Sequence, residues 1–298
     1  MMNISALLAP APVWLRRHLI VKGLLGAFPN SHDQWIEFNE GARAYVDLRD
    51  PEVRNVFLTR SFEPDFCRLA LTILSEGGVL FDCGANFGLC TFALIPFFVS
   101  GRVSSHLFEA NPSLISYLGR SKSLFPSARI EIVEGCVSDQ PGASHIAINS
   151  RFTGQSHVDS HGALEQRNVV LDDYLASKGI ERVTLLKMDL EGQELSALRG
   201  LSRTLRRGAI ETIYFEVRTE LLQRYGLTPS EIIDVLRKND FRIFYCRDWD
   251  LIGQSPTKLH FRKDGWNQLQ LSECTGAPGE LRTDLLAIHE SQILGTAA

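Results

Sequence analysis

The densest group of residues able to do chemistry occupies eight positions, where Lys187 is followed by Asp189, Glu191 and Glu194. The apolar segment 183–188 predicts a strand that ends here, and residues 191–206 predict a helix. In an open α/β sheet, ligands bind outside the carboxyl ends of the strands. Asp189 or Glu191 could accept a hydroxyl proton as a general base, and Asp189 could instead orient a substrate or ligate a hard cation. Glu194 could simply stabilise the start of the helix.

A glycine-containing turn, Phe-Asp-Cys-Gly-Ala-Asn-Phe-Gly at 81–88, lies between a predicted strand and a predicted helix. Glycine suits close backbone approach to a ligand, and the free N–H groups of a helix start suit an anion. The pattern is Asp-x-Gly-x-x-x-Gly, not the G-x-G-x-x-G of nicotinamide enzymes. We expect Asp82, Gly84, Ala85, Asn86 and Gly88 to bind a cofactor with an ammonium group. S-adenosylmethionine has such a group; the alternative is a plain turn with packing glycines.

Two further acids follow the next two predicted strands. Glu109 lies 21 residues after Gly88, near the spacing at which an acid binds ribose hydroxyls. Asp139 follows the third strand and could accept from an adenine amino group, although Asp is also a common turn residue.

His157 and Glu216 are weaker candidates for the site. His157 is of a residue type that can act as a base near neutral pH, but its polar surroundings favour a loop histidine without a role. Glu216 ends the fifth predicted strand and could face the acceptor, or be a solvated or ion-paired acid.

The elements that must position these residues alternate between strands and helices, which predicts an α/β fold with a parallel sheet. The predicted strands are 79–83, 102–108, 129–133, 183–188, 209–217 and 241–246, with 259–262 as a last candidate. The predicted helices are 86–98, 112–124, 172–177, 191–206 and 229–238. We therefore expect a mostly parallel, seven-stranded, Rossmann-like sheet with helices on both faces.

The same pattern suggests how the chain is divided. We expect a partly helical N-terminal extension at 1–60, a domain at 61–264 with an edge insertion at 144–168, and a C-terminal tail at 265–298. Residues 4–25 are apolar with interspersed basic residues, but prolines interrupt them and the charges come late, unlike a signal peptide. No segment supplies the ~20 apolar residues of a membrane span.

Composition limits the partners. The chain has 31 basic and 35 acidic residues and a net charge of −4, which argues against nucleic-acid binding. Its six cysteines form no CxxC pair and no zinc-ligand spacing with histidine, so we expect free thiols, a cytoplasmic location and no metal. The sequence does not define the oligomeric state.

Taken together, five segments of this chain resemble the FkbM family of methyltransferases. They are FDCGANFG (81–88), FEANP (108–112), VVLDDYL (169–175), LLKMDLEGQELSALRGL (185–201) and IYFEV (213–217). The resemblance implies a class I methyltransferase fold with S-adenosylmethionine as donor. It also implies that Asp82, Gly84, Asn86 and Gly88 line the methionine part and that Glu109 lines the ribose.

Members of that family are mostly associated with O-methylation of sugars or natural-product hydroxyls, so a small-molecule or glycan acceptor is expected. Two alternatives stay open. One is a nicotinamide-dependent oxidoreductase on a similar sheet, and the other is a cofactor-binding protein without turnover. Fold alone does not choose between them.

Overall fold

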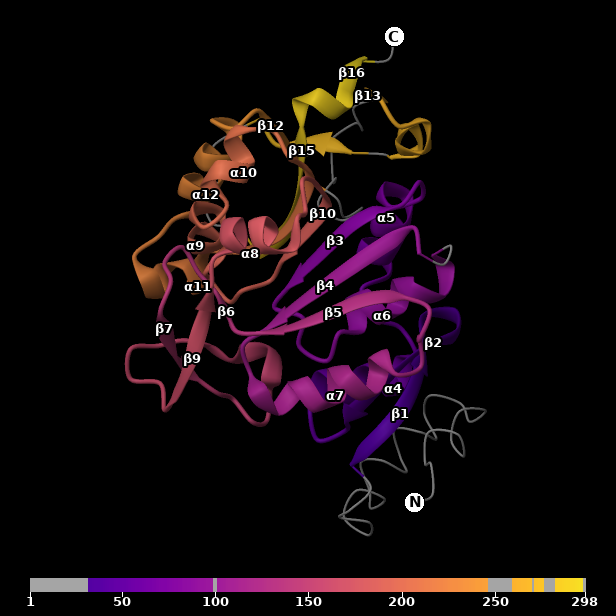
Figure 1. The fold of residues 1–298 in the computed structure, drawn as a ribbon, viewed down its shortest axis with the longest axis vertical. Coiled ribbons are helices and arrows are strands. Elements are labelled where there is room, and N and C mark those ends of the chain that lie inside the picture. Colours follow the sequence, from indigo (N-terminus) through magenta and orange to yellow (C-terminus); the bar gives the residue numbers. More distant parts are fainter. Residues whose placement is uncertain (1–31, 99–100, 246–258, 270, 276–281, 297–298) are drawn as a thin grey trace.

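The computed structural model describes residues 32–98, 101–245, 259–269, 271–275 and 282–296. Eight strands form the central sheet: β3 (Gly78–Cys83), β4 (Val103–Glu109), β5 (Arg129–Glu134), β10 (Val183–Met188), β11 (Ile210–Arg218), β12 (Phe241–Tyr245), β14 (Ser272–Glu273) and β15 (Arg282–His289). Their order is β14-β12-β15-β11-β10-β3-β4-β5. Figure 1 shows β10, β3, β4 and β5 side by side. The five strands from β11 to β5 are parallel, and β15 is antiparallel to both of its neighbours. The predicted mostly parallel α/β sheet is thereby confirmed, although it has eight strands and not the seven expected, because β14 and β15 join it from the predicted tail.

Helices cover both faces of this sheet, as the sequence predicted (Figure 1). On one face lie α4 (Pro51–Thr59), α5 (Pro64–Ile73), α6 (Leu89–Leu94) and α7 (Pro112–Lys122). On the other lie α8 (Leu171–Lys178), α9 (Glu194–Arg199), α10 (Ser202–Arg206) and α12 (Pro229–Arg237). Because side chains alternate along a strand, Leu80 and Leu185 pack in the first apolar core while Phe81 and Leu186 pack in the second.

Local capping explains several helix boundaries. Asp50 accepts hydrogen bonds from the N–H groups of Glu52 and Val53, so α4 begins at Pro51. The single helix predicted at 191–206 is instead two helices, α9 and α10. The carboxylate of Asp172 accepts from the N–H groups of Arg203 and Thr204, and these contacts stabilise a separate start for α10.

The described part of the N-terminal extension contains a hairpin that the sequence did not predict. Strands β1 (Asp33–Phe38) and β2 (Ala42–Asp47) pair antiparallel and pack beside α7. Ser121 on α7 accepts from the N–H of Tyr45 at 2.8 Å, and the Tyr117 hydroxyl donates to Asp33 at 2.7 Å. The apolar segment at 4–25 lies outside the described residues.

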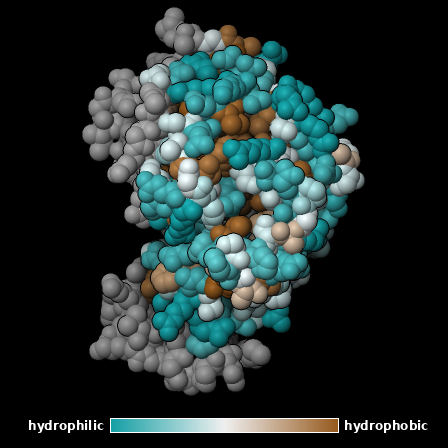
Figure 2. All heavy atoms as spheres, turned by 90° about the vertical axis from the view of Figure 1, so that its left-hand side faces the viewer, coloured by the Kyte–Doolittle hydropathy of each residue, from teal (hydrophilic) through white to brown (hydrophobic). Residues whose placement is uncertain are grey.

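The expected insertion forms a small sheet of its own. This sheet contains β7 (Ala143–Ala147), β8 (His157–Val158) and β9 (Leu164–Val169), joined by β6 (Cys136–Val137), which precedes the insertion. The strand order is β6-β9-β7-β8. A short 3-10 helix, η4 (Thr153–Gln155), lies between β7 and β8. Figure 2 views the molecule from this side and shows a largely hydrophilic surface with hydrophobic residues visible in recesses.

The C-terminal region differs from the predicted tail. Strand β15 lies inside the sheet, between β11 and β12, and pairs with Thr212–Arg218 along its length. The predicted strand at 259–262 is β13 (Leu259–Phe261), which pairs with β16 (Ile293–Thr296) away from the main sheet. The pairing of β15 with residues some 70 positions earlier is non-local, so local patterning does not reveal it.

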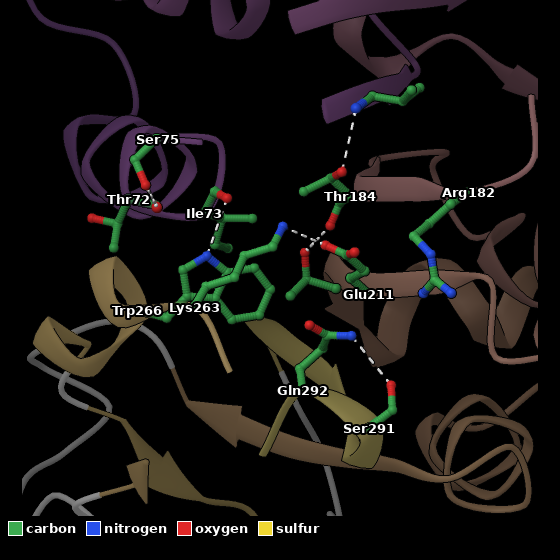
Figure 3. Close-up of polar contacts among 12 residues, drawn as sticks. Thr72, Ile73, Ser75, Arg182, Thr184, Glu211, Lys263, Trp266, Ser291 and Gln292 are labelled. Atoms are coloured by element: carbon green, nitrogen blue, oxygen red, sulfur yellow. Dashed lines mark hydrogen bonds and ion pairs between the residues drawn. The ribbon is translucent and has the colours of Figure 1, made fainter. Parts of the chain in front are cut away.

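Side chains at the amino ends of the strands hold this region in place (Figure 3). The buried indole of Trp266 donates from Nε1 to the carbonyl of Ile73 at 3.1 Å. Lys263 contacts the buried carboxylate of Glu211 at 2.7 Å. These contacts lie at the edge of the sheet opposite to the carboxyl ends of the strands. Within the described residues, no helix has both the length and the apolar character needed to cross a bilayer.

Candidate active site

Two cavities meet at the carboxyl ends of the central strands. The larger is about 450 Å³ and lies between α4, the loop 84–90 and the ends of β10 and β11. The smaller is about 80 Å³ and lies between the ends of β4 and β10 and the insertion. Five residues line both: Gly84, Asn86, Gly154, Asp189 and Glu191. A ligand lying across this boundary would reach both cavities.

Gly84 allows the loop after β3 to lie against the end of β10. Its φ is +79°, and a Cβ built on it would lie 1.9 Å from the carbonyl oxygen of Asp189. Any side chain would therefore push apart the two strand ends that form the boundary between the cavities. Ala85 lines the larger cavity, whereas Gly88 starts α6, where a Cβ would meet the Phe92 ring at 2.5 Å.

Glu109 lines the smaller cavity at the end of β4. One carboxylate oxygen accepts from the N–H of Asn86 and the other from the N–H of Asn111, both at 2.7 Å. Burial raises the pKa of Glu109 to about 7, although these backbone donors oppose the effect. Each oxygen can accept a further hydrogen bond, so this fixed carboxylate fits a pair of ribose hydroxyls.

Asp82 lies beneath the glycine loop and does not line either cavity. It is 1% exposed, accepts from Thr91 at 2.7 Å, and lies 3.7 Å from the Lys187 ammonium. The sequence suggested that Asp82 contacts the ammonium group of the cofactor. In this structure its carboxylate contacts Thr91 and Lys187 and does not line a cavity. Asp82 instead balances Lys187, whose second partner is Asp189 at 3.3 Å. Burial opposes the charge of Lys187, but Asp189 and Asp82 raise its pKa well above the usual value.

Three carboxylates gather where β10 and β11 end. Oxygen atoms of Asp189, Glu191 and Glu216 lie within 4.8 Å of one another, and all three residues line the larger cavity. Burial and the nearby Asp189 raise the pKa of Glu191 to about 7 and that of Glu216 to about 8. Such a group could hold a hard cation or share protons, and the spacing alone does not define a metal site. Glu216, a weak candidate in the sequence, thus joins the two predicted catalytic acids.

Glu194 does not face the cavities. Its carboxylate accepts from the N–H of Leu190 at 2.9 Å and from that of Gly192 at 3.4 Å. These bonds hold the tight turn in which Glu191 has a left-handed φ of 53°. Glu194 therefore positions Glu191 by stabilising its loop.

The insertion reaches over the boundary between the cavities. The Thr153 hydroxyl lies 2.8 Å from the Asn86 side-chain oxygen and 2.9 Å from Asp50, which also accepts the Thr153 N–H. The Asn86 side chain is thus oriented by the insertion. His157 lines the smaller cavity, a placement that its sequence context did not favour.

Asp139 lies outside both cavity walls. Its carboxylate accepts from the Ser196 hydroxyl at 3.2 Å, and its N–H donates to the same oxygen at 3.2 Å. This places Asp139 against α9, and its expected contact with an adenine amino group stays a prediction. The apolar wall of the smaller cavity comes instead from Val137, Ile146 and Val158, which offer a surface for a flat base.

This combination of sheet order, glycine loop, ribose-ready acid and strand-end carboxylates defines a class I methyltransferase that uses S-adenosylmethionine. The chain belongs to the FkbM methyltransferase family, because the Methyltransferase FkbM domain matches residues 82–243. The resemblance seen in the sequence is thereby confirmed. Membership decides against both alternatives, the nicotinamide-dependent oxidoreductase and the protein without turnover.

The individual proteins to which the chain is similar have low sequence identity to it. The hexuronic acid methyltransferase AglP of Haloferax volcanii is 27% identical over 189 residues, covering 61% of this chain and 76% of the relative. An FkbM methyltransferase structure from Methylobacillus flagellatus is 16% identical, with a TM-score of 0.40, and the match covers 71% of this chain and 44% of that one. An O-methyltransferase structure from Thermotoga maritima is 13% identical, with a TM-score of 0.39 and coverage of 88% and 80%.

Proposed function

We propose that this methyltransferase transfers the methyl group to a hydroxyl of a saccharide or related metabolite. One observation carries the proposal: Asp189 and Glu191 line both cavities. Carboxylates at that boundary can act on an acceptor hydroxyl that approaches from the larger cavity. The hexuronic acid methyltransferase among the relatives supports a sugar-like acceptor.

The residues of the smaller cavity suit the adenosine part of the cofactor. Glu109 is placed to accept from the ribose hydroxyls, and Ile146 and Val158 to contact the base. The loop with Gly84, Ala85 and Asn86 then lines the methionine part. When bound, S-adenosylmethionine supplies a methyl group attached to a positively charged sulfur.

Asp189 and Glu191, the two carboxylates that line both cavities, have different roles in this proposal. Glu191, with a pKa of about 7, is suited to take the hydroxyl proton near neutral pH. Asp189, held by the Lys187 ammonium at 3.3 Å, is suited to orient the acceptor. In this proposal Asp189 and Glu191 are the catalytic residues and Lys187 is a positioning residue.

The test is methyl transfer from S-adenosylmethionine to a panel of methyl glycosides and polyols, with mass spectrometry to locate the added methyl group. The proposal expects an O-methyl product with at least one sugar and its loss in Glu191→Gln. Glu165, which is exposed on β9 and outside both cavities, provides the matched control Glu165→Gln. Methylation of amines or proteins alone would contradict the hydroxyl acceptor. A cytoplasmic location and the lack of a nucleic-acid partner stay predictions.

A further inference from the structure

The larger cavity has an unusual balance of charge for a site that would take an acidic sugar. Of the described residues that line it, seven are acidic and two are basic. Glu52 from the start of α4 faces this cavity together with Asp189, Glu191 and Glu216. The acids therefore come from both the N-terminal helix and the central strands.

Both basic residues already have carboxylate partners. Lys187 is buried and lies 3.3 Å from Asp189 and 3.7 Å from Asp82. The Arg218 guanidinium lies 2.9 Å from the carboxylate of Glu220. Both basic side chains among the described lining residues are thus already paired with carboxylates. A carboxylate on the acceptor would therefore meet several negative charges in the cavity and would have to compete for either cation.

The carboxylates already raise one another's pKa, as expected of acids that share a cavity. Glu52 is exposed to solvent on one side, yet the surrounding protein and the carboxylates of Asp189 and Asp50 raise its pKa to about 7. Further negative charge in this space would add to that repulsion, whereas a positive group would relieve it.

Aromatic side chains complete the wall. Phe62, Phe152 and Tyr214 line the same cavity, and Phe152 is 41% exposed. An aromatic face attracts an ammonium group and packs against the C–H face of a sugar ring. The electron-rich face of a ring does not attract a carboxylate.

We infer that the larger cavity selects its acceptor by charge, with Glu52 and Glu216 as specificity-determining residues: it favours saccharides that carry an amine, accepts neutral ones and rejects uronates. This rests on the proposed function, whose saccharide acceptor it narrows. The substrate class named for the Haloferax volcanii relative would then not be the substrate class of this chain.

The experiment compares three matched acceptors: methyl glucoside, its 2-amino-2-deoxy analogue and methyl glucuronide, all with EDTA present. We expect kcat/KM for the amine to exceed that for the uronide by roughly tenfold or more at low salt. In the double variant Glu52→Gln, Glu216→Gln the ratio should fall to about threefold or less, while Glu165→Gln keeps it. Equal or better use of the uronide would overturn the inference, as would a ratio unchanged in the double variant.

A second readout requires no acceptor. S-adenosylmethionine carries a positive sulfur that S-adenosylhomocysteine lacks, so an acidic cavity favours the former. Calorimetry should show that the affinity ratio of the two falls by about threefold or more in the double variant. If no glycoside is methylated but this ratio falls, the saccharide acceptor fails and charge selection is supported. If glycosides are methylated and the ratio does not change, charge selection fails and the proposed function is supported.

Discussion

Replacing Glu109 by glutamine tests the cofactor site most directly. In the native protein both carboxylate oxygens are fixed by backbone N–H groups at 2.7 Å, so ribose hydroxyls would meet a preoriented, charged acceptor. Glutamine keeps the shape but has one oxygen and one NH₂ group, and the NH₂ group faces a backbone donor. A hydrogen bond to a charged group is worth about 1.5–3 kcal/mol. Affinity for S-adenosylmethionine should therefore fall roughly 10- to 100-fold in Glu109→Gln.

The pH dependence makes the test sharper. The raised pKa of Glu109, about 7, means that the carboxyl group is mostly protonated at pH 6 and mostly ionised at pH 8. If the ionised form binds ribose, native affinity rises about tenfold between these pH values through this group. Other glutamates near the site also titrate, so the informative quantity is the difference between native protein and Glu109→Gln.

Isothermal titration of S-adenosylmethionine and S-adenosylhomocysteine at pH 6, 7 and 8 measures both effects, with NADH as a negative control. Glu165→Gln, at an exposed position on β9, should match the native protein at every pH. Native affinity in Glu109→Gln, or a pH dependence identical to that of the native protein, would refute the assignment of Glu109 to the ribose.

Four further outcomes follow from the structure. Glu191→Gln should lower kcat by roughly 10²–10⁴-fold in a radiometric methyl-transfer assay, while calorimetry shows a far smaller loss of cofactor affinity; an unchanged kcat would rule out Glu191 as the base. Lys187→Met leaves buried Asp82 without its cation, so urea denaturation should show a loss of roughly 3–5 kcal/mol. Trp266→Ala should cost about 3–5 kcal/mol in the same assay, yet its folded form should bind the cofactor normally, because Trp266 lies at the opposite edge of the sheet. The cofactor-free protein should lose stability as pH rises from about 5 to 8. Burial raises the pKa of Glu109, so in this pH range the folded state binds more protons than the unfolded state. Stability that persists to pH 8 would contradict this.

The sequence could predict the parts of the site that depend on local patterning. The apolar runs before Asp189 and Glu109 identify strands, and the carboxyl ends of parallel strands meet at one edge of a sheet. Gly84 marks the close approach between two of those ends. Proximity of Gly84, Glu109, Asp189 and Glu191 therefore follows from strand order, and both cavities confirm that these residues lie near one another.

The direction of each side chain could not be predicted in the same way. Asp82 is one residue from the end of β3 and points into the protein, where Lys187 and Thr91 hold it. Asp139 follows β6 and contacts Ser196 on α9. Lys187 and Ser196 are far along the chain from Asp82 and Asp139, respectively, and a motif does not show which of two faces a polar side chain will take.

The position of β15 in the sheet could not be predicted from the sequence either, because it depends on contacts with residues far along the chain. Its residues become a strand through pairing with β11 and β12 on either side. The same pairing matters for the site, since it brings Asp284 opposite Glu216, and both line the larger cavity. A segment expected to be a tail thus contributes to the acidic character of the larger cavity.

Charge links the buried and the open parts of this site. The Lys187 ammonium lies between Asp82, which is buried, and Asp189, which is at the boundary of the cavities. Its charge is therefore balanced by these two carboxylates, and it holds Asp189 in place. Glu191 and Glu216 have raised pKa values because burial and the carboxylate of Asp189 disfavour their ionised forms, and the charge of Arg218 offsets this only in part. Their protonation should therefore depend on the charge of the group that binds in the cavity. A positive sulfur or an acceptor amine would favour their ionised forms, and ionised Glu191 is the form that can take a proton. Binding of the correct partners would therefore prepare the base for the reaction, which a carboxylate-bearing acceptor could not do.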